Sequence, residues 1–380
     1  MTGPPRLIIG TYTEDLPHVS GQADGVLGAA YDPATGTIGA VTVLARCRNP
    51  SFAAIGADGT SVYVVNETAS FAGQPGGGIT AYARRPDTGA LRELGARSSG
   101  GAAPCQLAID PSGRALLVAN YEGGSVLAAS IEPDGSLGPE LGRVQHAGSG
   151  ADPVRQTGPH PHMAAPDPVT GDILVADLGL DAVLTYRLTG TGLTERPGAQ
   201  FAAPPGAGPR HLAFHPDGRH LFVVDELDSS VLTLRRTADH AADHAADHAD
   251  DHSGGRFELV GVTATVPPGD AGPSLAAAIR VTPSGRHVLV SNRGHDSIAM
   301  LSFDPAARAR AAPLTLTHLE PAGGSGPRDL CLTPDGARLV AATTDSHRLT
   351  VLEIDETAGR LRLTGAAEAP SPASVLFAPR

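Results

Sequence analysis

The sequence predicts an all-β fold, namely a seven-bladed β-propeller whose N- and C-terminal strands share one blade. The main observation is a unit that recurs seven times in 380 residues: a short apolar strand, a turn typically containing Asp-Gly or Ser-Gly, and an alternating strand. The copies begin at Pro50, Pro104, Pro161, Pro209, Ala276, Pro327 and Pro372, the last being the least complete. A repeat of about 40 to 50 residues needs its neighbours to bury its faces. The 47 Gly and 33 Pro residues also suit short strands and tight turns.

The fourth copy shows the expected strands of one blade. Residues 209–214 read as a first strand, and 221–225 as a second strand after an Asp-Gly turn, the strongest short hairpin signal. Residues 230–234 and 257–260 supply a third and a fourth strand. Four antiparallel strands repeated about an axis form a propeller, in which the first strands line the centre.

The two ends of the chain predict how the ring closes. Residues 372–379 supply a first strand without a second, whereas residues 7–12 form a second strand without a first. Residues 25–31 and 38–44 would complete this shared blade, which leaves no free sheet edge. We therefore expect one domain over residues 1–380.

Residues 237–253 interrupt the fourth copy with a repeated Ala-Asp-His sequence. A helix here would align His240, His244, His248 and His252 beside aspartates, and such a face could bind a divalent metal. The alternative is a repetitive tract that expanded in a tolerant surface loop and stays disordered. We favour disorder and expect no metal site.

Composition argues against several classes of partner. The formal net charge of −12 and the lack of a basic tract argue against nucleic acid. Cys47, Cys105 and Cys331 are odd in number and far apart, which predicts buried free thiols rather than disulfides or a zinc site. No apolar run reaches the roughly 18 residues of a membrane span, and no signal-peptide pattern precedes the first strand. A cytoplasmic monomer is therefore expected.

Aligning the copies separates positions that serve the fold from positions that serve a site. The first column, directly after the opening residue, reads Ser51, Cys105, His162, Arg210, Ala277, Arg328 and Ala373. The second column, directly after the second strand, reads Tyr12, Glu67, Tyr121, Leu178, Glu226, Arg293 and Thr344. Antiparallel pairing places the two columns side by side at one mouth of the ring.

The polar members of these columns are the candidate site residues. They supply a titratable imidazole, a carboxylate and several guanidiniums; the residues are His162, Arg210, Glu226, Arg293 and Arg328. Such a set suits an anionic substrate. His160, His211 and His215 are weaker candidates, and Arg280 is out of phase with Arg210 by strand alternation. A third column preceding the second, with Asn or Asp in five of seven copies, predicts structural hydrogen bonds.

The sequence contains no nucleophile elbow, phosphate loop or His-Glu-x-x-His motif, which favours acid–base catalysis without a cofactor. The chain also contains Ile-Gly-Thr-Tyr at 9–12, Asn-Pro-Ser-Phe at 49–52, Gly-Pro-His-Pro-His at 158–162, Gly-Pro-Arg-His-Leu at 208–212, Val-Asp-Glu-Leu at 224–227, Ile-Arg-Val at 279–281 and Ser-Asn-Arg-Gly-His-Asp-Ser at 291–297. By these motifs, nearly the whole chain resembles the bacterial seven-bladed propeller lactonases, whose named activity is 6-phosphogluconolactonase, and their fungal relative, carboxy-cis,cis-muconate lactonizing enzyme.

The resemblance implies hydrolysis of a sugar-acid lactone, as in the pentose phosphate pathway, with His162, Arg210 and Glu226 as the active site and Arg280 as a further arginine. By the column argument, Arg293 is a rival to Arg280. Arginines would hold the carboxylate or phosphate, and either His162 or Glu226 would take the proton from water. Two alternatives stay open: a carboxymuconate cycloisomerase, and a non-catalytic binding scaffold.

Overall fold

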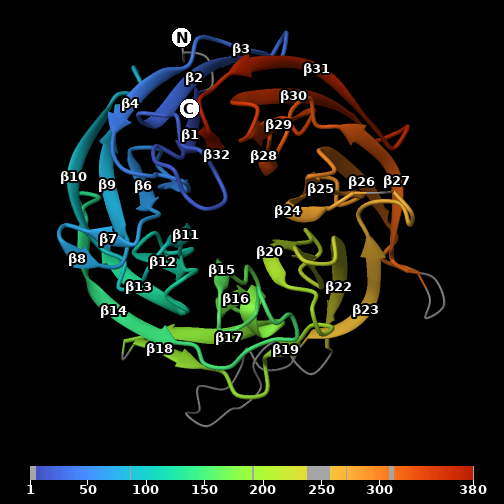
Figure 1. Ribbon diagram of the computed structural model, residues 1–380, viewed down its shortest axis with the longest axis horizontal. Coiled ribbons are helices and arrows are strands. Elements are labelled where there is room, and N and C mark those ends of the chain that lie inside the picture. Colours follow the sequence, from blue (N-terminus) through green and yellow to red (C-terminus); the bar gives the residue numbers. More distant parts are fainter. Residues whose placement is uncertain are drawn as a thin grey trace.

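The computed structural model describes residues 6–85, 87–190, 192–237, 257–270, 272–307 and 312–379, which form seven antiparallel sheets of four or five strands and one two-stranded sheet. Figure 1 shows the sheets arranged as a ring around a central axis, with one strand of each sheet innermost. Among these residues the one helical element is the 3-10 turn η1 (Leu178–Leu180), and no helix is long and apolar enough to cross a membrane. The predicted seven-bladed propeller is confirmed.

Blades are numbered from the first sequence copy, and each is given from the inner strand outward. Blades one to three contain β5 (Ala53–Ile55), β6 (Ser61–Asn66), β9 (Gly78–Arg84) and β10 (Leu91–Ser98); β11 (Pro104–Ile109), β12 (Ala115–Asn120), β13 (Ser125–Ile131) and β14 (Leu137–Gln145); and β15 (Pro161–Pro166), β16 (Ile173–Asp177), β17 (Ala182–Thr189), β18 (Gly192–Glu195) and β19 (Phe201–Ala202). A small hairpin of β7 (Ser70–Phe71) and β8 (Gln74–Pro75) extends from blade one.

Blades four to six contain β20 (Pro209–Phe214), β21 (His220–Asp225), β22 (Ser230–Arg236) and β23 (Phe257–Ala264); β24 (Leu275–Val281), β25 (His287–Arg293), β26 (Ser297–Phe303) and β27 (Leu314–Pro321); and β28 (Pro327–Leu332), β29 (Arg338–Thr343), β30 (Arg348–Asp355) and β31 (Arg360–Glu368). The four strands predicted for the fourth copy are all present, with a longer outer strand. The predicted tract at 237–253 lies outside the described residues, apart from Thr237.

Blade seven closes the ring as predicted. Its inner strand is β32 (Pro372–Ala378), followed by β1 (Arg6–Thr11), β2 (Gly25–Asp32) and a divided outer edge of β3 (Thr37–Ile38) and β4 (Thr42–Arg46). The antiparallel register of β1 and β32 runs from Arg6 opposite Ala378 to Thr11 opposite Pro372. Figure 1 shows the first and the last strand, β1 and β32, in this blade. The reading of the ring as a single domain remains our interpretation.

Apolar side chains fill the interfaces between neighbouring blades. Between blades four and five, Phe222 and Val224 of β21 pack with Ile279 of β24 and Val290 of β25, and all four are fully buried. Since each blade is covered on both faces, its inner strands cannot slip by one residue without moving apolar side chains out of these layers. This rigid packing holds the strand ends, and therefore the candidate site, in place.

The third column supplies structural hydrogen bonds, as predicted. Asn120 Nδ2 donates to the carbonyl of Ser99, and Asn292 Nδ2 donates to the carbonyl of Thr265, in both cases beyond the outer strand of the preceding blade. Asp177 instead accepts the backbone N–H of His160 at 2.8 Å. These side chains tie the second strand of a blade to surrounding backbone that would otherwise be unpaired.

The three cysteines are free, as predicted, but only Cys105 is fully buried. Cys47 and Cys331 are half-buried, so the expectation of three buried thiols is correct for one residue. Cys105 follows the opening proline of blade two, where the first column turns toward the axis. The Cys105 thiol lies against the neighbouring blade, where it contacts the backbone carbonyls of Pro161 and His162 in blade three.

Candidate active site

A recurrent backbone arrangement aims the first-column side chains away from their own sheets. In blade four, Pro209 pairs with Asp225 and His211 with Val224, so Arg210 is the extra residue of a β-bulge. The same shift leaves out Cys105, His162, Arg328 and Ala373 in four other blades. Bulges re-aim side chains and are frequent beside active sites. The repeated bulge therefore gathers one side chain per blade near the axis.

A second repeated feature joins the two columns. In six blades, the residue before the opening proline accepts a hydrogen bond from the second-column N–H; in blade four, Glu226 N donates to Gly208 O at 2.8 Å. Gly208 has a φ of 73°, in the left-handed region that glycine adopts without strain. Ala103 occupies the same position in blade two with a φ of 49°, which costs about 1 kcal/mol. The backbone thus fixes Glu226 beside Arg210.

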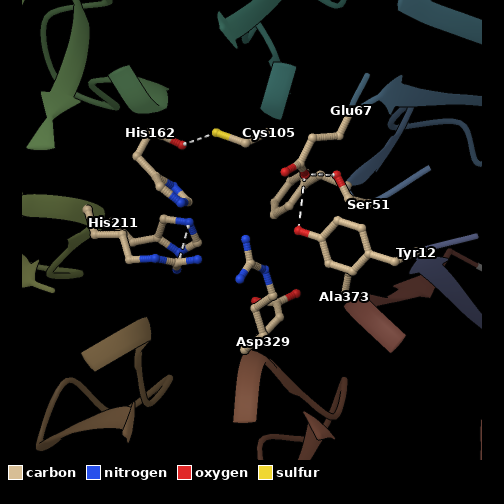
Figure 2. A pocket seen from close by; sticks show the side chains of 11 residues that line it. Tyr12, Ser51, Glu67, Cys105, His162, His211, Asp329 and Ala373 are labelled. Carbon is tan, nitrogen blue, oxygen red and sulfur yellow. Dashed lines mark hydrogen bonds between the residues drawn. The ribbon is translucent and has the colours of Figure 1, made fainter. Parts of the chain in front are cut away.

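The columns surround a cavity of about 830 Å³ and a much smaller pocket. Glu67, Cys105, His162 and Arg328 line both. The other polar lining residues of the large cavity include Tyr121, Arg155, Glu226, Arg293 and Thr344. Figure 2 shows the small pocket, where His162 and His211 face Glu67, Ser51 and Tyr12. The large cavity has the size of typical small-molecule sites.

Glu226 is the centre of a buried charge cluster. Its Oε2 accepts from Arg210 Nε at 2.9 Å and lies 2.7 Å from Arg293 Nη2, while its Oε1 accepts from Arg155 Nη2 at 2.6 Å. Burial alone would raise the pKa of Glu226, but the guanidiniums of Arg293, Arg210 and Arg155 outweigh it and hold the pKa well below its usual range. The carboxylate is therefore ionised, with an excess of positive charge around it.

Arg210 is the most enclosed member of this cluster, with 2% of its surface exposed. Besides Glu226, it donates from Nη1 to the carbonyl of Ala277, the first-column residue of the next blade, at 2.7 Å. Burial and the neighbouring charge of Arg293 lower the pKa of Arg210, but the guanidinium stays protonated at neutral pH. Arg210 thus connects blades four and five and orients Glu226.

His162 is buried beside these cations. Its ring lies edge-on to Tyr121, with centroids 5.7 Å apart, and to His211, at 5.1 Å. Burial, and then the charges of Arg210 and Arg328, lower the pKa of His162 well below its usual value, so the imidazole is neutral at neutral pH. Among the described residues, nothing hydrogen-bonds to its buried Nδ1 atom. The ring therefore has an unengaged nitrogen.

Arg328 carries an uncommitted positive charge in the same cavity. Its guanidinium carbon lies 5.3 Å from the centre of the Tyr12 ring, a cation–π arrangement. Within the part of the chain that the structure describes, the guanidinium makes no hydrogen bond or ion pair. Since Arg328 lines both cavities, its donors are available to a ligand.

Arg280 lies outside this group. It donates to Asp329 Oδ1 at 2.8 Å and to the carbonyl of Ile279, and it lines neither cavity. Asp329 lines only the small pocket, whereas Arg293 lines the large cavity. Of the sequence-predicted candidates, the structure brings His162, Arg210, Glu226, Arg293 and Arg328 together and leaves Arg280 with Asp329.

Sequence reasoning did not single out two residues of the cavity. Arg155, which pairs with Glu226, belongs to the irregular loop before β15 and has no counterpart in the repeat. Glu67 is a member of the second column, and its carboxyl accepts hydrogen bonds from Tyr12 and Ser51. A carboxyl group in that column was the available signal for Glu67, whereas no pattern in the sequence marks Arg155.

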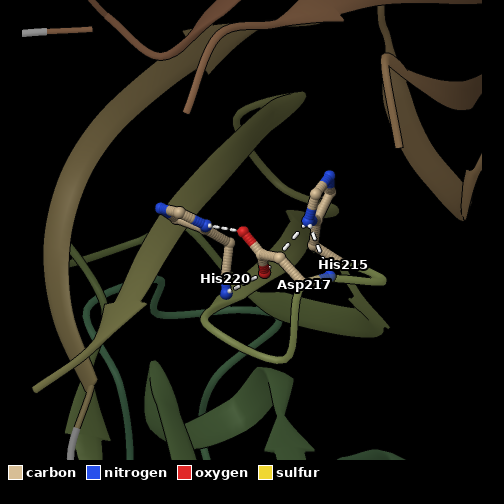
Figure 3. A group of neighbouring side chains, drawn as sticks. All are labelled: His215, Asp217 and His220. Carbon is tan, nitrogen blue, oxygen red and sulfur yellow. Dashed lines mark hydrogen bonds and ion pairs between the residues drawn. The ribbon is translucent and has the colours of Figure 1, made fainter. Parts of the chain in front are cut away.

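Two of the other histidine candidates, His160 and His215, have structural roles, whereas His211 lines the small pocket beside His162. His160 stacks on Tyr121, with centroids 4.4 Å apart, and contacts the Tyr121 carbonyl. His215 and Asp217 lie in the turn between β20 and β21, and His220 begins β21. Three potential ligand atoms of these residues fall within 4.8 Å of one another (Figure 3). Hydrogen bonds already join both imidazoles to Asp217 or its backbone, and His215 Nε2 contacts the Gly285 carbonyl at 3.0 Å. This cluster therefore secures the turn.

The fold and the cavity define a β-propeller with an arginine-rich chamber at one mouth of its ring. The model of the family described as lactonase, 7-bladed beta-propeller, matches residues 6–377, and the chain belongs to this family. The 6-phosphogluconolactonase of Bacillus subtilis strain 168 is 31% identical over 370 residues, which are 97% of each chain. The 6-phosphogluconolactonase of Pectobacterium carotovorum is 30% identical over 280 residues, 73% of this chain and 75% of that protein. The structure of the periplasmic gluconolactonase PpgL of Pseudomonas aeruginosa is 28% identical, with a TM-score of 0.86 and 99% of each chain covered.

Proposed function

We propose that the protein hydrolyses a sugar-acid lactone, with 6-phosphogluconolactone as substrate and 6-phosphogluconate as product. The observation that carries the proposal is one cavity of about 830 Å³ that contains a neutral imidazole with an unengaged nitrogen and an uncommitted guanidinium. These are the two groups that lactone hydrolysis needs, a base for water and a cation for the oxyanion. The names of the relatives agree with this substrate class.

In the proposed reaction, His162 takes the proton from the attacking water. Both oxygens of Glu226 are already held by guanidinium groups, so this carboxylate has no unengaged oxygen to accept a proton from water. The His162 ring is neutral over the whole neutral range, and its Nδ1 atom has no partner among the described residues. We therefore assign the base to His162 and give Glu226 the role of fixing the arginines.

Different arginines serve the oxyanion of the intermediate and the phosphate of the substrate. Arg328 stabilises the oxyanion of the tetrahedral intermediate, because its guanidinium is uncommitted and shares both cavities with His162. Arg155 and Arg293 bind the phosphate, since the three guanidiniums around Glu226 exceed its single negative charge. Glu122 and Asp345 also line the large cavity but are exposed and therefore solvated. Arg210 is a positioning residue, and Arg280 is left out.

The test measures proton release from freshly generated 6-phosphogluconolactone and from unphosphorylated gluconolactone, corrected for spontaneous opening. We expect His162→Ala to lower kcat by about 10²–10⁴-fold. His318→Ala is the matched control, because His318 is half-buried on the outer strand β27 and lines neither cavity. We expect Arg293→Ala to raise KM more for the phosphorylated lactone. Failure of the wild-type protein to accelerate either lactone would refute the proposal.

In this proposal the enzyme acts as a monomer and needs no cofactor, because side chains supply both the base and the cation of the reaction. Size-exclusion chromatography with light scattering would check the monomer. The cytoplasmic location expected from the sequence stays a prediction. If the lactones are not hydrolysed, the loss of absorbance of 3-carboxy-cis,cis-muconate is the next assay, because a cycloisomerase would use the same imidazole to move a proton while closing a lactone.

A further inference from the structure

Glu67 is a second carboxyl group in the cavity wall, and the proposed hydrolysis does not yet use it. It follows β6 of blade one, where its N–H donates to the Asn49 carbonyl at 2.9 Å, and 6% of its surface is exposed. It lines both the large cavity and the small pocket. Figure 2 shows Glu67 with Ser51 and Tyr12 across from His162. The candidate base and Glu67 therefore border the same space.

The two oxygens of Glu67 have different surroundings. Oε2 accepts hydrogen bonds from Tyr12 OH, at 3.1 Å, and from Ser51 Oγ. Among the described residues, Oε1 makes no hydrogen bond. His18 Nε2 lies 3.9 Å away, but burial and the charge of Arg328 lower the pKa of His18 to about 4, so this imidazole is neutral at neutral pH. Because Oε2 already receives two donors, a proton on this carboxyl group resides on Oε1.

We propose that Glu67 is the general acid of the reaction, which gives the proton on Oε1 to the ring oxygen of the lactone as the ring opens. This inference rests on the proposed lactone hydrolysis. An alkoxide is a poor leaving group, so protonation as the C–O bond breaks lowers the barrier of this step. His162 and Glu67 would then act on opposite sides of the reacting carbonyl carbon, one as base and the other as acid.

The protonation state of Glu67 fits this role. Burial raises its pKa above the usual value, opposed in part by the charge of Arg328, and no guanidinium forms an ion pair with it among the described residues. Glu226 is equally enclosed but is held by three guanidiniums, which keep it ionised. Two carboxyl groups of one site whose environments separate their pKa values commonly divide the acid and electrostatic roles.

The proton balance closes without a further reactant. Water attacks the carbonyl carbon and loses a proton to His162, while the carbonyl oxygen becomes an oxyanion beside Arg328. The oxyanion reforms the C=O bond, the bond to the ring oxygen breaks, and that oxygen takes the proton from Glu67. The products are a hydroxy acid, an imidazolium and a carboxylate. Transfer of the imidazolium proton to Glu67 through solvent restores the enzyme, and ionisation of the new acid releases the one proton that the assay detects.

The experiment compares two lactones that differ in leaving group: gluconolactone, which releases an aliphatic alcohol, and dihydrocoumarin, which releases a phenol with a pKa of about 10. Glu67→Gln keeps an oxygen that can accept from Ser51 and Tyr12, but it has no proton to transfer. We expect kcat to fall by about 10²–10⁴-fold for gluconolactone and by less than about 10-fold for dihydrocoumarin. Glu122→Gln, in the same cavity but exposed, is the control.

Equal losses for the two lactones, or no loss, would overturn the acid role while leaving the lactonase standing. A wild-type protein that opens neither these two lactones nor 6-phosphogluconolactone would overturn the proposed function and this inference with it. Ser51→Ala supplies a second readout in case Glu67→Gln does not fold. Because the Ser51 hydrogen bond lowers the pKa of Glu67, its removal should move the alkaline limb of the kcat profile to higher pH. An alkaline limb that stays in place contradicts the assignment.

Discussion

Replacement of Glu226 by Gln should destabilise the protein strongly, because it removes the single anion that three guanidiniums share. Arg210 Nε and Arg293 Nη2 lie 2.9 and 2.7 Å from the same oxygen, and only 2% of the Arg210 side chain is exposed. Two unit charges about 5 Å apart repel by about 3 kcal/mol at an effective dielectric constant of about 20. Breaking a buried ion pair by removal of one partner typically costs about 3–5 kcal/mol. We expect a loss of that size at pH 7.

Urea unfolding followed by circular dichroism and tyrosine fluorescence measures this loss, since the chain has no Trp. The matched control is Glu258→Gln, whose partner Arg235 lies 2.6 Å away on the surface of blade four, with about half of each side chain exposed. Such exposed pairs contribute about 0–1 kcal/mol. Sulfate should recover stability in Glu226→Gln more than in the wild type, because a dianion can take the place of the carboxylate between the guanidiniums.

The lowered pKa of Glu226 determines how its contribution to stability changes with pH. The folded-state pKa of Glu226 is depressed, so its stabilisation is complete above the unfolded value of about 4.5 and is lost as the pH falls toward the folded value. The gap between the wild type and Glu226→Gln should therefore stay constant from pH 8 to pH 5 and close only in strong acid. A gap no larger than that of Glu258→Gln at pH 7 would refute the electrostatic account of the cluster.

Three further outcomes follow from buried groups. Burial, and then the charge of Asp228, raise the pKa of Asp225, so the free energy of unfolding should fall as the pH rises above about 4. In urea titrations, Asp225→Asn should abolish this fall and add about 1–3 kcal/mol to the free energy of unfolding at pH 7. The acid limb of kcat/KM should lie well below pH 6.5, because the base His162 is neutral down to that range; a limb at pH 6.5 or above would exclude it. Arg236→Met should lower the free energy of unfolding by about 3–5 kcal/mol in the same assay. The reason is that Arg236 Nη2 donates to both oxygens of the buried Asp167 in blade three, at 2.8 and 2.7 Å. A loss below about 1 kcal/mol would contradict this account.

The repeat made the ring and the two columns predictable from sequence. Each copy places a proline, a strand and a turn in the same order, and backbone pairing then brings the first and second columns together in every blade. The position of Arg210 beside Glu226 therefore needed only antiparallel pairing. The predicted closure by both termini followed from the same logic, since each end supplied the strands that the other lacked.

The sequence could not reveal the bulge after the opening residue, and this limits any argument from strand alternation. In blade five, the pairing shifts between Ala276 and Ile279, so the orientation of Arg280 relative to Arg210 depends on backbone geometry that no residue type marks. Arg155 was unpredictable for another reason, because it reaches Glu226 from a loop outside the repeat. Which arginine remains uncommitted depends on side-chain positions, so Arg328 could not be distinguished from Arg293 in advance.

The different states of the two carboxyl groups follow from a departure from symmetry in a nearly symmetric scaffold. Glu67 and Glu226 occupy equivalent positions, each fixed by the same backbone hydrogen bond. Their own first-column neighbours differ, Ser51 in blade one and Arg210 in blade four, and Arg155 and Arg293 reach only Glu226. A hydroxyl group stabilises a carboxylate far less than guanidiniums do, so burial dominates at Glu67 and charge dominates at Glu226. Equivalent backbone positions thus hold a carboxyl group with a raised pKa in one blade and a carboxylate with a lowered pKa in another.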